Sequence, residues 1–542
     1  MKRLKFVLAL GMLLWQVPAF AEEGDFTPYP DRWRITPPPY ELNVSGSLLD
    51  PYNQNTIKGD RPIWGQDVFL SLTGISDTLL EYRTLPTPSG ASSASPNSMD
   101  FFGDSKQLLI VQNFILSLDL FKGRTAFKPF DWRIQTTLIA NFNQINTEER
   151  GVVNPDVRRG TDRDDDFFAV QELFLEVHLA DISPNYDFVS VRAGLQQFRS
   201  DFKGFIYTDT NLGVRFFGNA ESNRNQYNLA FFDQREKDTN SGLNTTEDTR
   251  NQEIGIVNFY RQDFGVKGYT TQLSVHHLKD DPSFEFDVND RLARPDPVGA
   301  FTPHEIEATY YGWAGSGHIG IINIEHAFYS VDGDDDLNPI SARAVEIKAH
   351  MAAVELSVDR DWLRPKISYF YASGDDDPND NEAEGFDAIF DSPSFAGGGF
   401  SFWNRMGIGL AGTGVTLVNR GSLLPSLRTS KEEGQPNFVN PGLHLINAGV
   451  DLELTPKVKG IFNVNYLWFD KTEVLEFLLF QPNIQKEIGL DVSFGMRYRP
   501  YLNNNIVGVL GIASFFPGEG FANIYESKKN LNTMFTNVTF LF

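Results

Sequence analysis

Long segments in which apolar and polar residues alternate run through almost the whole chain. In "DWRIQTTLIANFN", Trp132, Ile134 and Leu138 share one face of an extended strand, while Arg133 and Gln135 share the other. A strand of a soluble β-sandwich also alternates but commonly has about five or six residues, whereas a tilted strand that crosses a bilayer needs about 9 to 11. Most of these segments reach the longer range. Because lipid offers no partners to a sheet edge, the sheet must close. The sequence therefore predicts an all-β fold, a transmembrane antiparallel β-barrel.

Eighteen such segments can be placed, an even number as in bacterial single-chain barrels. The even-numbered connections, such as "NAESNR", "GSG" and "TPK", are tight and rich in turn residues, whereas the odd-numbered ones are longer. This regularity predicts short turns at one end of the barrel and long loops at the other. A twenty-stranded barrel is the alternative, because the longest connection, residues 374–441, contains "FSFWNRMGIGLAGTGVTLVNR", which could hold a further hairpin.

The expected strands cover residues 66–83, 107–121, 131–144, 168–180, 187–198, 210–218, 225–234, 252–262, 267–279, 305–314, 318–331, 342–357, 363–373, 442–454, 458–470, 486–499, 504–516 and 531–542.

The two ends of the sequence predict where the protein goes. "MKRLKFVLALGMLLWQVPAFA" has a basic start, an apolar core too short for a membrane span and a small-residue cleavage pattern at Ala19 and Ala21, as in a secretory signal peptide. At the other end, "NTMFTNVTFLF" alternates up to Phe542 and resembles the carboxy-terminal signature that the outer-membrane assembly machinery reads. We expect a signal peptide at 1–21, a periplasmic tail at 22–64 and, at 65–542, a barrel in the Gram-negative outer membrane, in contact with lipid and lipopolysaccharide.

Composition and motifs exclude several function classes. The formal charge is −24, and loss of the expected signal peptide, with three positive charges and no acids, leaves −27; such a surface repels nucleic acid. The chain has no cysteine, so an exported protein of this kind depends on packing and hydrogen bonds rather than disulfides. It lacks G-x-S-x-G and H-E-x-x-H motifs, and its eight histidines are scattered. We therefore expect no enzyme.

Three acidic clusters fall in expected outward loops, at residues 162–166, 332–336 and 373–387. Carboxylates in a flexible loop could bind Ca²⁺, and Asp375, Asp376, Asp377 and Asp380 are the candidate ligands. The alternative is a solvated run of charge that keeps the loops soluble. We favour the second interpretation, because no cluster has the spaced D-x-D-x-D-G…E frame of a calcium loop. No other cofactor is expected.

The inward face of the predicted barrel carries both signs of charge. Charged residues either brace the wall as cross-strand ion pairs or orient a solute and set ion selectivity. Arg192 and Arg215 fall on adjacent strands, and Arg497 and Arg499 form a second basic row, which favours anionic solutes because guanidinium groups bind carboxylates well. Glu172 and Glu176 oppose this preference. The candidate lumen residues are Arg133, Arg192, Arg215, Arg261, Arg497, Arg499, Glu172 and Glu176.

Three stretches resemble the alginate-export family of outer-membrane barrels: "VQELFLEVHLA…VSVRAGLQQF" (170–198), "SGDDDPNDNEAEGFDAIF" (373–390) and "NFVNPGLHL" (437–445). Leu195 departs from the family pattern, which has a second basic residue at that place. The resemblance implies an eighteen-stranded barrel with a polar channel, which in the family's namesake passes an acidic polysaccharide.

Eighteen strands leave an aqueous lumen unless it is plugged. The sequence thus predicts a porin-type or export-type channel for passive passage of hydrophilic solutes, among them anionic carbohydrates and organic acids. The alternative is a non-conducting barrel that docks a periplasmic or surface partner. We also expect part of 374–441 to fold into the pore mouth, with Phe400, Phe402 and Trp403 packed against the wall, because connections of that length are unusual.

Overall fold

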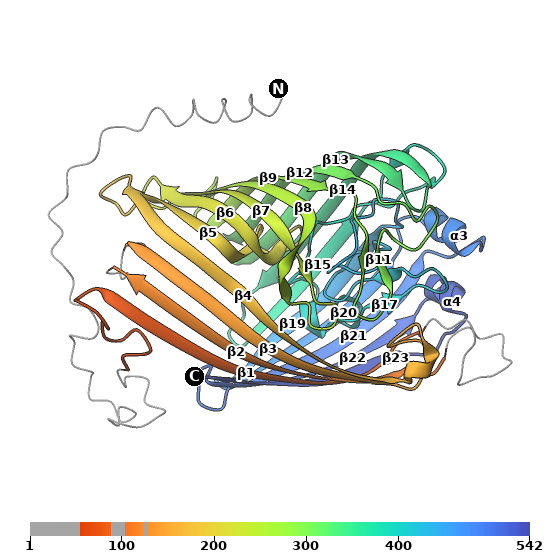
Figure 1. Cartoon of the computed structure of the whole chain (residues 1–542), viewed down its shortest axis with the longest axis horizontal. Coiled ribbons are helices and arrows are strands. Elements are labelled where there is room, and N and C mark those ends of the chain that lie inside the picture. The colour runs from red at the N-terminus through yellow and green to blue at the C-terminus, as the bar shows by residue number, and fades with distance from the viewer. Residues whose placement is uncertain (1–54, 88–102, 124–127) are drawn as a thin grey trace.

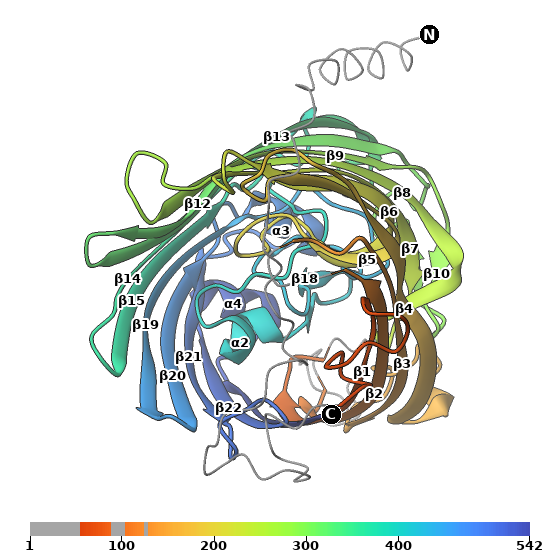
Figure 2. The same cartoon turned by 90° about the vertical axis from the view of Figure 1, so that its left-hand side faces the viewer.

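The computed structural model describes residues 55–87, 103–123 and 128–542. Within these residues, eighteen long strands form one closed antiparallel wall, so the strand number and fold class predicted from the alternation are confirmed. Figure 1 shows this barrel from the side, and Figure 2 shows its strands as a ring. The wall consists of β1 (Val68–Thr84), β2 (Lys106–Lys122), β3 (Trp132–Thr147), β4 (Asp162–Asp181), β5 (Phe188–Arg199), β6 (Thr208–Ala220), β7 (Asn225–Lys237), β8 (Asn244–Arg261), β9 (Tyr269–Asp280), β12 (Ile306–Ile319), β13 (Ile322–Asn338), β14 (Arg343–Val358), β15 (Leu363–Ala372), β19 (Leu443–Thr455), β20 (Val458–Trp468), β21 (Glu487–Tyr498), β22 (Ile506–Pro517) and β23 (Leu531–Leu541).

The first and last strands close the barrel. β1 pairs with β2 along one edge and with β23 along the other, from Ile75 opposite Leu541 to Arg83 opposite Thr533. Beyond the last pair, the amide of Phe542 donates to the carbonyl of Gly74 at 2.8 Å, and the amide of Gly74 donates back at 3.1 Å. β1 and β23 therefore join the two ends of the sheet, and the described strands form a closed wall.

The connections follow the predicted regularity. Tight turns such as residues 221–224, 320–321 and 456–457 lie at one end, on the left in Figure 1, and the longer loops lie at the other end. Two of those longer loops contain α3 (Glu473–Leu479) and α4 (Glu519–Tyr525). None of the helices in the described residues is both long enough and apolar enough to cross a membrane.

The expected signal peptide, 1–21, and most of the expected tail, 22–64, lie outside the described residues. The described end of the tail lies along β1, where the amide of Leu72 donates to the carbonyl of Ile57 at 2.7 Å. The ammonium of Lys58 lies 3.9 Å from the ring centre of Phe542.

The outer face of the barrel is apolar. Phe114, Phe142 and Phe168 belong to neighbouring strands. Each of these side chains is half exposed or more, because none of the described elements covers it. Such a belt of large apolar side chains is what a barrel presents to a bilayer. It suits a membrane environment and would be costly in water.

The inner face contains two unlike regions. The lumen face of β1 to β6, called the polar wall here, carries Asp119, Arg133, Glu172, Arg192 and similar residues. The lumen face of β8 to β15, called the apolar wall, is buried, and its residues include Ile254, Ile256, Leu278, Tyr310, Val331, Ile347 and Phe370. An apolar surface of this size inside a barrel requires a covering layer.

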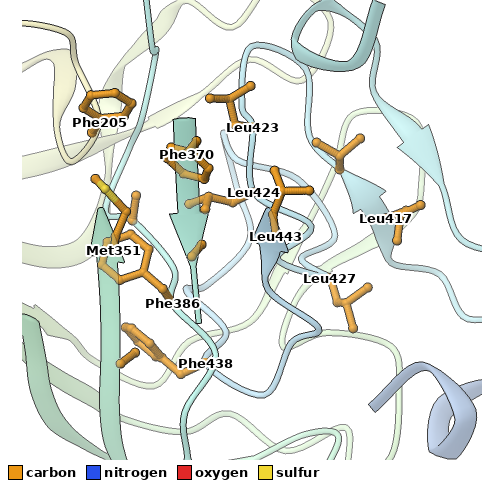
Figure 3. Close-up of a cluster of buried hydrophobic side chains, with 14 of the residues drawn as sticks. Phe205, Met351, Phe370, Phe386, Leu417, Leu423, Leu424, Leu427, Phe438 and Leu443 are labelled. Carbon is orange, nitrogen blue, oxygen red and sulfur yellow. The ribbon is translucent and has the colours of Figure 1, made fainter. Parts of the chain in front are cut away.

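Residues 373–442, called the long loop here, supply that layer. Figure 3 shows Phe386, Phe438 and Leu424 of this loop packed against Met351 of β14 and Phe370 of β15. Burial of each side chain of this size stabilises the folded protein by about 1.5 to 3 kcal/mol relative to leaving it exposed to water. The short connection between β5 and β6 also folds inward, and the amide of Ser392 donates to the carbonyl of Gly204 at 2.9 Å. The two connections therefore pack as one body inside the ring.

The twenty-stranded alternative is wrong. The long loop contains only short elements: β16 (Glu382–Ala383), η3 (Gly398–Phe400), α2 (Phe402–Arg405), β17 (Ile408–Gly409) and β18 (Thr416–Val418). β17 and β18 pair with each other, and β16 lies parallel to the end of β14, so the long loop adds no strand that spans the wall. The remaining short elements are η2 (Val157–Arg159), β10 (Glu285–Phe286) and β11 (Leu292–Arg294).

Two acidic clusters expected in loops lie in strands instead. Residues 162–166 begin β4, and residues 332–336 belong to β13. Both strands continue past the apolar belt, where neither face has to be apolar. Hydrogen bonding with the neighbouring strands therefore extends into residues whose acidic composition is typical of a loop.

Candidate channel lining

Ion pairs and hydrogen bonds across the strands organise the polar wall. Arg133 of β3 makes a bidentate ion pair with Asp119 of β2, with its Nε 2.8 Å from Oδ1 and its Nη2 2.9 Å from Oδ2. Glu172 of β4 accepts from the amide of Gln135 at 2.8 Å and from the hydroxyl of Thr137 at 2.7 Å. These contacts match the bracing role of cross-strand pairs, and they fix the side chains on the wall.

Arg192 and Arg215 lie side by side, as their predicted adjacent strands require. They are direct cross-strand partners on β5 and β6. Arg192 pairs with Glu176 at 2.5 Å, whereas Arg215 donates to the amide oxygen of Asn228 at 2.8 Å. The Glu176 carboxylate therefore offsets the charge of Arg192, and the neighbouring Arg215 charge has a neutral hydrogen-bond partner.

A second cluster of charge joins the long loop to β1. The carboxylate of Glu81 is completely buried and lies among three guanidinium groups. Arg405 of α2 approaches it to 2.5 Å, Arg83 of β1 to 3.2 Å and Arg420 of the long loop to 3.6 Å. One carboxylate among three guanidinium groups leaves two net positive charges inside the barrel.

The α2 helix holds this cluster against the wall. Ser401 caps its first turn by accepting from the amide of Asn404, and Asp491 of β21 accepts from the amides of Phe402 and Trp403 at 3.1 and 3.3 Å. The ring of Phe402 stacks on Phe515 of β22 at 5.7 Å between centres.

The aromatic contacts of the long loop agree with the sequence. Phe400 stacks on Phe535 of β23 at 5.8 Å between centres, and Phe402 and Trp403 are both fully buried, with Trp403 6.3 Å from Phe515. The prediction that these three aromatic residues pack against the wall is confirmed.

A cavity of about 680 Å³ opens beside this cluster at the long-loop end. Arg83 lines it and also contacts Glu81, so the cavity reaches the cluster through Arg83. Polar Gln107 and Thr416 share the lining with apolar Leu410 and Val415. The cavity could admit a small solute that has both polar and apolar parts.

Three of the candidate lumen arginines do not join these groups. Arg261 ends β8 with the parity of the outward-facing Val257 and Phe259, and it pairs with Glu221 at the rim, so its assignment to the lumen is wrong. Arg497 lies opposite Lys459 near the turn end of β21, and Arg499 follows that strand, with its amide bonded to the carbonyl of Lys457. Arg497 and Arg499 therefore lie at the turn end of β21, several strands along the wall from Arg192 on β5 and Arg215 on β6.

The candidate cation ligands do not converge. Asp375 accepts from the amides of Asp377 and Glu384, Asp377 and Asp380 each cap a backbone turn, and Asp376 pairs with Lys471 at 2.9 Å. Burial raises the pKa of Asp375 to about 7. Across the described residues, no group of three or more acidic, histidine or cysteine side chains is placed to hold a metal ion. The acidic residues serve as turn caps and ion-pair partners.

Four functional candidates were not identified from the sequence: Glu81, Arg83, Arg405 and Arg420. Glu81 and Arg405 are 324 residues apart, so no local pattern links them. The available signal was a basic residue directly after the aromatic run "FSFWN" of the long connection, since an arginine carried by a segment that packs inside the barrel must find a partner there.

No protein-family model matches the sequence, and no curated protein matches it. The fold is similar to that of a BenF-like porin from Pseudomonas fluorescens Pf-5, at 9% identity and a TM-score of 0.47, with 87% of this chain and 98% of that chain covered. It is also similar to OccD3 (OpdP) from Pseudomonas aeruginosa, at 11% identity and a TM-score of 0.46, with 93% and 99% covered. OccK9 (OpdG) from the same species matches at 11% identity and a TM-score of 0.45, with 87% and 98% covered.

Proposed function

We propose that this protein is an outer-membrane channel for passive passage of small hydrophilic solutes, and that it prefers anions. The observation that carries the preference is the Glu81 cluster, where three guanidinium groups face one carboxylate beside the 680 Å³ cavity. A solute carboxylate within about 4 Å of one such group gains on the order of 4 kcal/mol at the effective dielectric of a protein surface. The apolar outer belt supports insertion in a bilayer, where lipid and lipopolysaccharide surround the barrel. The outer-membrane assembly machinery recognises the chain through Phe542.

The solute class we favour is small organic and carbohydrate acids rather than a polysaccharide of the alginate type. The long loop covers the apolar wall, which leaves the polar wall and the cavity at Arg83 as the hydrophilic surfaces. Glucuronate, which is bound in the solved structure of OccK2 from Pseudomonas aeruginosa, is a suitable test solute because it combines one carboxylate with a polar ring.

Planar-bilayer recording tests the proposal. In a salt gradient the reversal potential of the wild-type channel should indicate anion preference. Replacing Arg405 and Arg420 of the Glu81 cluster together by alanine should shift it towards cations, and so should replacing Arg192 and Arg215 together. Arg261→Ala is the matched control, because it removes an arginine from the outer face and should leave the reversal potential unchanged. Cation preference of the wild-type protein, or an equal shift in the control, would contradict the proposal.

A non-conducting barrel that docks a partner is the second candidate, and the extensive packing of the long loop inside the ring favours it. The same recordings separate the two functions. Silence across many insertions of protein that is shown to be folded by its heat-modifiable migration would favour the docking barrel.

A further inference from the structure

We propose that Glu81 is a positioning residue for anion selectivity: it does not meet the solute but holds Arg405 and Arg420 of the long loop where a solute carboxylate can reach them. This inference rests on the proposed channel function and names the residue on which the anion specificity of the channel depends.

The burial of the four groups supports this division of roles. The side chain of Glu81 has no exposed surface, and those of Arg83 and Arg405 are 12% and 13% exposed, whereas that of Arg420 is 45% exposed. A solute can therefore touch Arg420 but cannot touch Glu81.

The contacts also differ in strength. Arg405 is held firmly: two of its nitrogens lie 2.7 and 2.5 Å from Glu81, and its guanidinium lies 3.5 Å from the ring centre of Phe535. Arg420 lies 3.6 Å from the same carboxylate, outside hydrogen-bond distance. Its donors therefore remain available to a second carboxylate, while Glu81 still attracts the group towards the wall.

Without Glu81 the arrangement would not persist. Three guanidinium groups that stay charged under all ordinary conditions would repel one another with no anion between them. Arg405 and Arg420 both belong to the long loop, so this repulsion would move loop residues and not only side chains. The exposed face of Arg420 would then no longer be held beside Glu81 and Arg83.

This role makes a prediction opposite to simple charge counting. Glu81→Gln removes a negative charge from the lumen, so charge counting predicts tighter glucuronate binding. Positioning predicts that the binding of glucuronate, measured as block of single-channel current, weakens by about tenfold, the loss expected when one charge-assisted hydrogen bond is no longer formed. Asp77→Asn is the matched control, because Asp77 lies on the same strand and face but is bonded to Asn537 and Thr539. That control should tighten binding slightly.

Two further variants keep the test decisive even where Glu81→Gln folds poorly. Glu81→Asp retains the charge, so charge counting predicts no change, whereas positioning predicts weaker binding because the carboxylate is drawn back by one methylene. Arg420→Gln should weaken binding by itself and should add little when combined with Glu81→Gln, because both changes remove the same contact.

Tighter binding in Glu81→Gln, unchanged binding in Glu81→Asp, or fully multiplicative losses in the double variant would each overturn the positioning role. Absence of both glucuronate block and anion preference in the wild-type channel would instead overturn the proposed function.

Discussion

Asp491 anchors the long loop to the wall, and its removal gives the most direct test of that anchor. Its carboxylate is fully buried on the lumen face of β21 and accepts from the hydroxyl of Ser401 at 2.5 Å and from the amides of Phe402 and Trp403 at 3.1 and 3.3 Å. Asp491→Ala leaves these two backbone donors of α2 without their charged acceptor. A hydrogen bond to a charged group is worth about 1.5 to 3 kcal/mol, so docking of α2 should weaken by about 3 to 6 kcal/mol.

Hydrogen–deuterium exchange measures this loss locally. If α2 opens independently of the barrel, even 3 kcal/mol speeds exchange of residues 398–406 by about a hundredfold, because every 1.4 kcal/mol is a factor of ten. Asp491→Asn keeps the shape and one acceptor oxygen, so it should show a smaller increase. The wall strands should remain protected in both variants.

Ser493→Ala is the matched control. Ser493 is buried on the same strand and face, two residues along, and its hydroxyl has no hydrogen-bond partner in the described part of the chain. This change should leave exchange at 398–406 unaltered. Unchanged exchange in a folded Asp491→Ala protein would refute the anchoring role and would show that Phe402 and Trp403 hold α2 by packing alone.

Two other outcomes follow from the long loop. Deleting residues 392–420 should raise single-channel conductance and weaken glucuronate block, because the deletion removes α2, Arg405 and Arg420; unchanged conductance in a folded deletion variant would show that these residues do not restrict the pore. Burial raises the pKa of Asp375 to about 7 from an ordinary value of 3.8, so docking of the loop gains stability from this group below the ordinary value and loses it as pH rises through about 7. The protection of residues 373–390, which is their exchange rate relative to the intrinsic rate of an unstructured peptide at the same pH, should accordingly be lower at pH 8 than at pH 5, and Asp375→Asn should flatten that difference.

The strands could be predicted from the sequence because each one has to satisfy the bilayer. All eighteen expected segments overlap the observed strands, but some ends differ: β4 begins at Asp162 rather than 168, and β8 begins at Asn244 rather than 252. The alternation fades where a strand leaves the apolar belt, although hydrogen bonding with its neighbours continues. Periodicity therefore locates the membrane-spanning part of a strand better than its full length.

The lumen could be predicted only in part. The alternation places Arg133, Glu176 and Arg192 on the polar wall. The residues directly before and after each of them in the chain are apolar and belong to the opposite face of the strand. The alternation failed for Arg261, because residues 254–259 of β8 include apolar side chains on both faces, so a polar residue that follows them gave no indication of direction. The Glu81 cluster depends on contacts between distant parts of the chain, which a pattern along the chain cannot contain.

The strands that are apolar on both faces nevertheless carried a signal. In "EIGIVNFYR", Ile254 and Ile256 are buried inside the barrel while Val257 and Phe259 face outward. A water-filled lumen would leave the inward pair exposed at a cost of about 1.5 to 3 kcal/mol for each side chain, so such a strand requires a filled lumen on its side.

That requirement determines which experiments on the long loop are informative. The loop covers Met351, Phe370 and the rest of the apolar wall, and it therefore belongs to the core of the protein. Deleting residues 392–420 exposes part of that wall, so a loss of folding would not reveal what the loop does in the pore. Asp491→Ala loosens the loop where it meets the wall and leaves every apolar side chain in the chain. The substitution consequently separates the contribution of the loop to conductance from its contribution to stability, which the deletion cannot do.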